Sequence, residues 1–412
     1  MVDFSRYLFP GAGIWWGQFA AEPTPLIHEL LDQVGAIGHI KAFLGLTRDK
    51  RFLRELPKEI DVVSYGALGG LRQVSEARRL EVVPCNYSML PRLFAERRLP
   101  SDVGLVQVAP PDADGYCSLG IGVEYVADAA SHTPVLIAEI NRRMPSTRGS
   151  TRIHISRFAA IVESDRPLPS APHRAATDVE KRIAVNIAGL VCDGDTVQMG
   201  VGSLPAAVSE NLLNHKDIGI HSGMISDGIL ALIDKGVVTG ARKEVDAGLV
   251  VAGAAIGSAT LYDRVPDLPV EFRPASYTHS PGVLAMFRSL VSINSAIEVD
   301  LTGQVGAEYR RGVYVGAVGG QADFSRAAAV TGARSIIAIR STSRGESTIK
   351  TGLEYGAVTT SKADVDYVVT EHGVAELRGA DLAVRARRLV AVAAPEHRDR
   401  LLREIKNRRL AS

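Results

Sequence analysis

Short apolar runs alternate with helical patterns along the whole chain, and several of the runs end at glycine. The clearest runs are, in chain order, Ile60–Tyr65, Val103–Val108, Pro134–Glu139, Thr196–Met199, Ile336–Arg340 and Val365–Thr370. Continuous apolar runs of this length, with helices between them, are typical of parallel strands that are buried on both faces. The pattern therefore predicts an α/β protein with two related open α/β domains and mostly parallel sheets.

A stretch rich in proline and alanine, Asp165–Ala176, separates the two halves of this pattern. Thr177 follows it, and Glu180 stands three residues further on, which is the spacing of a capping box at the start of a helix. We therefore expect a first domain over residues 1–175 and a second over residues 176–412. The strand followed by a glycine turn recurs in both, which indicates that the two domains are related.

Composition and charge exclude several classes of function. The chain has 412 residues, of which 46% are hydrophobic and 23% charged, and its net charge is +1. This balance is typical of a globular protein and gives no electrostatic basis for binding nucleic acid or an anionic membrane. No apolar run reaches membrane-spanning length. The cysteines are isolated, and no metal-ligand spacing is present, so we expect a cytoplasmic protein without a metal.

Glycine turns supply the first candidate binding elements. The segment Thr196–Val208 reads TVQMGVGSLPAAV, so a strand ends at a turn made by Gly200, Val201 and Gly202. Backbone N–H groups at such a turn can hold an oxyanion or a phosphate. Pro205 stands where the dinucleotide-binding fingerprint needs glycine, so a nucleotide site of that type is not indicated.

A second glycine segment reads YVGAVGGQADF over Tyr314–Phe324. Its glycines, Gly316, Gly319 and Gly320, allow backbone to approach a ligand closely, and Gln321 follows them. A turn that serves only the fold would show the same glycines. Both interpretations remain open on the residues alone.

Several blocks together give the chain a recognisable pattern. Each combines glycine, proline or acidic residues at fixed spacing, and they are Leu105–Gly120, Ala138–Ser156, Ile218–Leu230, Ser292–Val305, Tyr314–Phe324 and Val358–Gly379. With these blocks the chain resembles the acetyl-CoA hydrolase/transferase family, in its 4-hydroxybutyrate and butyrate CoA-transferase branch. That resemblance covers nearly the whole chain and implies a class I CoA-transferase-like fold. It also implies coenzyme A or an acyl-CoA as substrate, and a homodimer by analogy.

The resemblance also assigns roles to residues, and the chain departs from the pattern at the most important one. In the family, the third residue of an H-S/T-E-M pattern is the glutamate nucleophile, whereas this chain reads His221, Ser222, Gly223 and Met224. A transferase of this type passes through a covalent glutamyl-CoA thioester, and glycine has no side chain that could form one. Thr348 also stands where the family usually has arginine. Ordinary CoA transfer is therefore not expected.

The family loops that remain define the expected pocket. The resemblance places Gly200, Val201 and Gly202 in it, together with Gly316, Gly319, Gly320 and Gln321. In the family, one backbone amide of the second of these segments polarises the thioester carbonyl. The expected partners are an acyl-CoA together with a small-molecule acceptor or water.

Four polar residues are candidates for the missing catalytic group: Glu298, Glu371, His372 and His221. Glu298 and Asp300 are two residues apart, so on a strand they share one face and could polarise a water or form ion pairs. Three hypotheses follow. The chain hydrolyses an acyl-CoA or transfers its acyl group without a glutamyl-CoA intermediate, binds acyl-CoA without catalysis, or uses a relocated carboxylate such as Glu298 as its nucleophile. On the first hypothesis, Gly223→Glu should raise CoA transfer.

Overall fold

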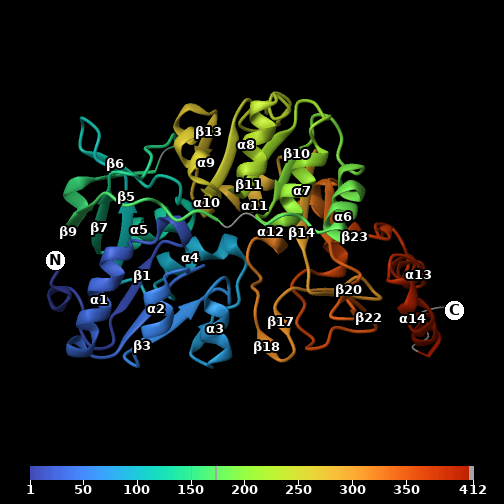
Figure 1. The fold of residues 1–412 in the computed structure, drawn as a ribbon, viewed down its shortest axis with the longest axis horizontal. Helices are drawn as coiled ribbons and strands as arrows, with labels where there is room; N and C mark the ends of the chain where they lie inside the picture. Colours follow the sequence, from blue (N-terminus) through green and yellow to red (C-terminus); the bar gives the residue numbers. More distant parts are fainter. Residues whose placement is uncertain (150, 172–173, 408–412) are drawn as a thin grey trace. The chain divides into compact units, whose positions relative to one another are not determined.

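The structure is a computed structural model that describes residues 1–149, 151–171 and 174–407 (Figure 1). Residue 150, in the block at 138–156, and residues 172–173, in the proline-rich stretch, lie outside the described residues, as do residues 408–412. Within the described part of the chain, no helix combines the length and the apolar character needed to cross a membrane.

The first sheet has seven strands in the order β4-β3-β2-β1-β5-β7-β9. Every pair of neighbouring strands in it is parallel. Its strands are β1 (Gly13–Trp16), β2 (Ile40–Phe43), β3 (Ile60–Ser64), β4 (Leu80–Val82), β5 (Val103–Val108), β7 (Val135–Asn141) and β9 (Phe158–Ser164). All six residues of β5 are buried, as expected for a strand with both faces covered.

The second sheet has eight strands in the order β13-β12-β11-β10-β14-β19-β23-β24. Strands β11, β10, β14, β19 and β23 pair in parallel from one to the next, whereas β24 pairs antiparallel to β23. The strands are β10 (Thr196–Met199), β11 (Gly219–Ile225), β12 (Val250–Ala255), β13 (Val270–Phe272), β14 (Leu290–Ser295), β19 (Arg334–Ala338), β23 (Tyr367–Thr370) and β24 (Gly373–Glu376).

Helices connect the strands along the chain (Figure 1). Those before the second sheet are α1 (Thr24–Ile37), α2 (Lys50–Glu55), α3 (Leu71–Glu76), α4 (Leu90–Ala95) and α5 (Glu124–His132). The later ones are α6 (Asp178–Ala188), α7 (Ser203–Asn211), α8 (Asp227–Asp234), α9 (Ala259–Arg264), α10 (Ala275–Thr278), α11 (Pro281–Leu284), α12 (Gln321–Thr331), α13 (Leu382–Ala391) and α14 (Pro395–Asn407).

Shorter strands lie outside the two large sheets. They are β6 (Tyr116–Ser118), β8 (Arg152–His154), β15 (Glu298–Asp300), β16 (Val305–Gly306), β17 (Tyr309–Arg310), β18 (Val313–Tyr314), β20 (Thr342–Ser343), β21 (Glu346–Ser347) and β22 (Ile349–Lys350). Strand β15 pairs with both β16 and β22.

The two large sheets repeat one strand order. In the first sheet, the central strand β1 is followed on one side by β2, β3 and β4 and on the other side by β5, β7 and β9. In the second sheet, the central strand β10 is followed in the same way by β11, β12 and β13 on one side and by β14, β19 and β23 on the other. The antiparallel edge strand β24 is the addition in the second sheet. The prediction of two related α/β domains with mostly parallel sheets is thus confirmed.

The chain forms two compact units that are interleaved in sequence. The first contains Met1–Ala171, Val251–Thr278 and Val313–Ala317, and the second contains Pro172–Val250, His279–Gly312 and Val318–Ser412. The first change of unit falls close to the expected boundary at residue 175. Two later segments return to the first unit, which a single boundary does not describe.

Helix α6 begins as the sequence predicts. The Thr177 hydroxyl oxygen accepts a hydrogen bond from the Glu180 N–H, and the Glu180 carboxylate accepts one from the Thr177 N–H, at 3.3 and 2.8 Å. The helix ends at Ala188, and its C-cap Gly189 keeps right-handed backbone angles, with φ −64°. Strand ends differ from the predicted ones by at most two residues, which is the usual uncertainty at the ends of elements.

A buried polar cluster in the first unit makes stability depend on pH. The Glu124 carboxylate accepts hydrogen bonds from the Tyr87 hydroxyl, at 2.6 Å, and from the Gln18 amide. Burial raises the pKa of Glu124 to about 7. Because this pKa lies above the ordinary value of 4.5, the group's contribution to stability is present below pH 4.5 and is lost as pH rises through 7.

Replacing Glu124 by glutamine should remove this loss while keeping acceptor and donor atoms in place. Between pH 5 and pH 8 we expect the free energy of unfolding of Glu124→Gln to fall less than that of the wild type, by about 3 kcal/mol. Chemical unfolding at the two pH values measures it. Glu163→Gln, at a side chain that is 70% exposed, is the control and should follow the wild type. Parallel pH dependences of the two variants would contradict the assignment.

Candidate functional site

The first glycine turn has the strand, turn and helix that the sequence predicts. Strand β10 ends at Met199, and α7 begins at Ser203 with Gly202 as its N-cap. Gly202 has a φ of +128°, a conformation that favours glycine. Among the described residues, nothing lies within 4 Å of the position a Cβ would take on Gly200 or Gly202. The turn is therefore bordered by open space.

The second glycine segment ends at the start of α12. Gly319 has a φ of +55°, Gly320 is the N-cap of the helix, and Gln321 is its first residue. The Gln321 side-chain amide donates to the Thr360 hydroxyl oxygen at 3.1 Å, which fixes the start of the helix. Earlier in the segment, the Gly316 carbonyl accepts a hydrogen bond from the Ala67 N–H within the first unit, at 2.8 Å.

Gly223 lies in the middle of β11 and is partly exposed. His221 stands two residues before it, so the two residues face the same side of the strand. A Cβ atom on Gly223 would lie 3.1 Å from Cε1 and 3.2 Å from Nε2 of His279. Apart from its chain neighbours, no other described residue comes within 4 Å of that position. The imidazole of His279 thus borders the space where a side chain at position 223 would begin.

His279 is buried, with 4% of its surface exposed, and its ring packs edge-on against Phe324 at 5.0 Å between centroids. Burial, and next the charge of His221, lower the pKa of His279 to about 3. The imidazole is therefore neutral at physiological pH. Sequence reasoning missed this residue, because a single histidine between two short helices has no motif spacing, and only the fold brings it to Gly223.

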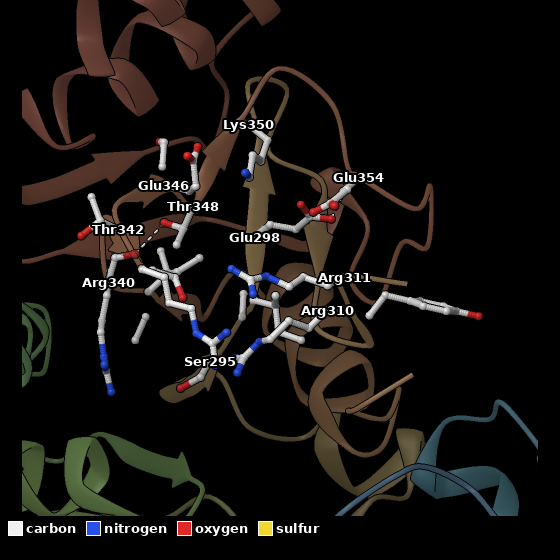
Figure 2. Close-up of a pocket in the computed structure, with 18 of the residues that line it drawn as sticks. Ser295, Glu298, Arg310, Arg311, Arg340, Thr342, Glu346, Thr348, Lys350 and Glu354 are labelled. Atoms are coloured by element: carbon white, nitrogen blue, oxygen red, sulfur yellow. Dashed lines mark hydrogen bonds between the residues drawn. The ribbon is translucent and has the colours of Figure 1, made fainter. Parts of the chain in front are cut away.

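A cavity of about 760 Å³ lies in the second unit. Residues of β15 and β22 line it, among them Glu298 and Lys350 (Figure 2). Basic side chains predominate in its wall: six cationic residues line it against four carboxylates. The cations are Arg310, Arg311, Arg340, Arg344, Lys350 and Arg400, and the carboxylates are Glu180, Glu298, Glu346 and Glu354. Its size and charge suit an anionic small molecule.

Glu298 is the one catalytic candidate that lines this cavity. Its Oε1 accepts a hydrogen bond from the Glu354 N–H at 2.9 Å (Figure 2). Burial raises the pKa of Glu298, and the positive charge of Lys350 opposes that rise. Asp300 has a structural role instead. Its Oδ1 accepts hydrogen bonds from the N–H groups of Thr302 and Gln304 and so stabilises a turn.

Thr348, which stands where the resemblance expects arginine, also lines the cavity. Its hydroxyl donates to the Arg340 carbonyl at 2.5 Å (Figure 2). The Arg340 side chain itself lies 3.0 Å from the Glu180 carboxylate. The cavity therefore keeps its basic character without an arginine at position 348.

The other candidates lie in two further places. Glu371 and His372 occupy the turn between β23 and β24, with 3.9 Å between the Glu371 Oε1 and the His372 Nε2. The Glu371 carboxylate accepts hydrogen bonds from the Ser341 N–H and hydroxyl, at 2.9 and 2.7 Å. His221 is buried in β11, and its ring packs on Phe287 at 4.8 Å. Of the four candidates, His221 is the one on the same strand as Gly223.

Comparison with known families identifies both parts of the chain. Residues 13–171 match the acetyl-CoA hydrolase/transferase N-terminal domain, and residues 257–405 match the acetyl-CoA hydrolase/transferase C-terminal domain.

Individual relatives agree with these matches. The 4-hydroxybutyrate coenzyme A transferase of Clostridium kluyveri is 44% identical over 82% of this chain and 80% of its own. The acetyl-CoA hydrolase of Yarrowia lipolytica is 22% identical over 73% of this chain and 65% of its own. The crystal structure of RipA from Yersinia pestis superposes with a TM-score of 0.93 at 36% identity, over 99% of this chain and 96% of that one.

Proposed function

Because the chain belongs to the acetyl-CoA hydrolase/transferase family, we propose that it binds an acyl-CoA and hydrolyses the thioester without a glutamyl-CoA intermediate. The observation that carries this proposal is the glycine at position 223 in β11, which the resemblance of the His221–Met224 segment assigns to the family nucleophile. A strand backbone without a side chain cannot form the covalent intermediate. Open space beside the first glycine turn supports continued binding of a ligand.

The reaction needs a group that stabilises the developing oxyanion and a nucleophile that replaces glutamate. Backbone N–H groups of Val201, Gly202 and Gly320 are the proposed donors to the thioester oxygen. Water attacks the carbonyl carbon, the C–S bond breaks, and the products are a carboxylate, the CoA thiol and one proton. A small-molecule acceptor at the same place would give acyl transfer instead.

The basic cavity of the second unit supports binding of the CoA phosphates. Arginine guanidinium groups bind phosphate through paired charge-assisted hydrogen bonds, and Arg310, Arg311 and Lys350 line the cavity together. Four carboxylates line the same wall, so the six cationic side chains outnumber them. We assign the cavity to the phosphate-bearing part of CoA.

Glu298 supports a second candidate function, a CoA transferase with a relocated nucleophile. The observation that favours it is a buried carboxylate, 7% exposed, in the wall of the basic cavity. Such a transferase would form its covalent thioester on Glu298. If the Glu298 carboxylate only contacts bound CoA and does not attack the acyl carbon, no covalent thioester forms on it.

Mass spectrometry of the intact protein and its peptides, after incubation with acetyl-CoA and borohydride trapping, separates these functions. A parallel assay measures released thiol. We expect thiol release without an adduct. An adduct on Glu298 or Glu371 would contradict the hydrolase proposal and support CoA transfer through a relocated nucleophile. Saturable binding with neither release nor adduct, over a series of acyl chains, would identify a non-catalytic acyl-CoA-binding protein.

A further inference from the structure

An imidazole borders the position that the resemblance assigns to the family nucleophile. Gly223 has no unusual φ, so its backbone would accept any L residue. What restricts position 223 is His279, whose Cε1 and Nε2 would both lie within 3.2 Å of a Cβ there. That distance is tighter than ordinary van der Waals contact. A side chain at position 223 would therefore require the His279 ring to shift by a few tenths of an ångström.

His279 reaches the second glycine segment as well. A Cβ on Gly320 would lie 2.5 Å from Nε2 and 2.7 Å from Cδ2 of the same ring. The nitrogen Nε2 thus lies between two positions, 223 and 320, that carry no side chain. Glycine at both leaves room for the ring. One of them is the family nucleophile position, and the other supplies a proposed oxyanion donor.

We propose that His279 takes the place of the missing glutamate and that its Nε2 hydrogen-bonds and orients the water that attacks the acyl-CoA thioester. This role rests on the proposed hydrolase function. The water oxygen bonds to the carbonyl carbon, the C–S bond breaks, and one water proton neutralises the departing thiolate. The other proton goes to solvent as the carboxylate forms.

The state of the ring suits orientation better than proton removal. The lowered pKa keeps the imidazole neutral at pH 7, so one ring nitrogen carries a proton and the other accepts a hydrogen bond. A neutral imidazole can make a hydrogen bond to a water beside the carbonyl without changing its own protonation state. A weakly basic ring removes a proton slowly, so His279 fixes the position of the water.

A first experiment tests where the ring lies, independently of hydrolysis. It compares Gly223→Glu with the double variant Gly223→Glu, His279→Ala, using glutamyl-CoA adduct formation and CoA transfer to acetate. We expect an adduct in the double variant at least tenfold more abundant than in the single variant, because alanine clears the space. The matched control, Gly223→Gln with His279→Ala, has the same size but no carboxylate and should form none. Equal adduct in single and double variants would overturn the placement.

A second experiment tests the nitrogen. His279→Leu fills much of the same space without a polar atom, and we expect kcat for thiol release to fall about 10²-fold with KM nearly unchanged. His279→Gln, which restores a polar side chain, should recover part of the rate. Folding of each variant is checked by circular dichroism and CoA binding. An unchanged kcat in folded His279→Leu, or a wild type that releases no thiol, would overturn the water-orienting role. The adduct comparison tests the placement in either case.

Discussion

Reversing the charges of Arg310 and Arg311 together should lower the affinity for CoA by roughly 10-fold. Both side chains line the basic cavity beside Glu298 and Glu354, so Arg310→Glu with Arg311→Glu adds negative charge to a wall that already holds carboxylates (Figure 2). A hydrogen bond to a charged group contributes about 1.5–3 kcal/mol. Both arginines are exposed, and screening by solvent puts the loss at the lower end of that range.

Titration calorimetry with CoA and with dephospho-CoA, at two salt concentrations, measures this effect. In the wild type, CoA should bind more tightly than dephospho-CoA, and salt should weaken the difference. In the double variant the two ligands should bind alike. Arg142→Glu, at a side chain that is 68% exposed in the first unit, is the matched control for surface charge. If affinity is unchanged in the double variant, the phosphates bind elsewhere.

Acidification should destabilise the wild type more than His279→Leu. The pKa of His279 in the folded protein, about 3, lies below the ordinary value of 6.5. The folded protein therefore binds fewer protons there than the unfolded chain. The contribution to stability is present above pH 6.5 and is lost as pH falls toward 3. Between pH 7.5 and pH 4.5, we expect the wild type to lose about 3 kcal/mol more than the variant.

Urea unfolding at pH 7.5, 6.0 and 4.5 measures this difference. The comparison uses the change with pH in each protein, because His279→Leu also alters packing at neutral pH. His39→Leu, at an exposed histidine, is the control and should follow the wild type. If the wild type and His279→Leu lose stability in parallel, the pKa of His279 is not lowered in the folded protein, and burial does not keep the imidazole neutral below its ordinary pKa of 6.5.

The fold could be predicted from the sequence because its signals are local. Continuous apolar runs mark the strands, Thr177 and Glu180 mark a helix start, and the glycines at 200 and 202 mark a turn. Each signal depends on residues within a few positions of one another. The repeated strand order of the two sheets appears in the sequence as a weak recurrence, because sheet order depends on pairing between distant strands.

The site could be predicted only in part. The absence of a side chain at Gly223 is legible in the sequence, whereas the ring that borders it is not, since His279 reaches Gly223 through the fold. Glu298 and Asp300 look equivalent two residues apart, but one lines the cavity and the other stabilises a turn. The two carboxylates differ in their hydrogen-bond partners, and the spacing of residues along the chain does not reveal those partners.

The interleaved path of the chain has a consequence for its synthesis. The first unit takes in Val251–Thr278 and Val313–Ala317 after the chain has already entered the second. Within that unit the Val123 N–H donates to the Gly253 carbonyl, and the Ala67 N–H donates to the Gly316 carbonyl. On the ribosome, the amino-terminal unit therefore waits for residue 317 to emerge before its last hydrogen bonds can form. Shortened nascent chains that end before this point should be cleaved by protease more readily than chains that extend past it.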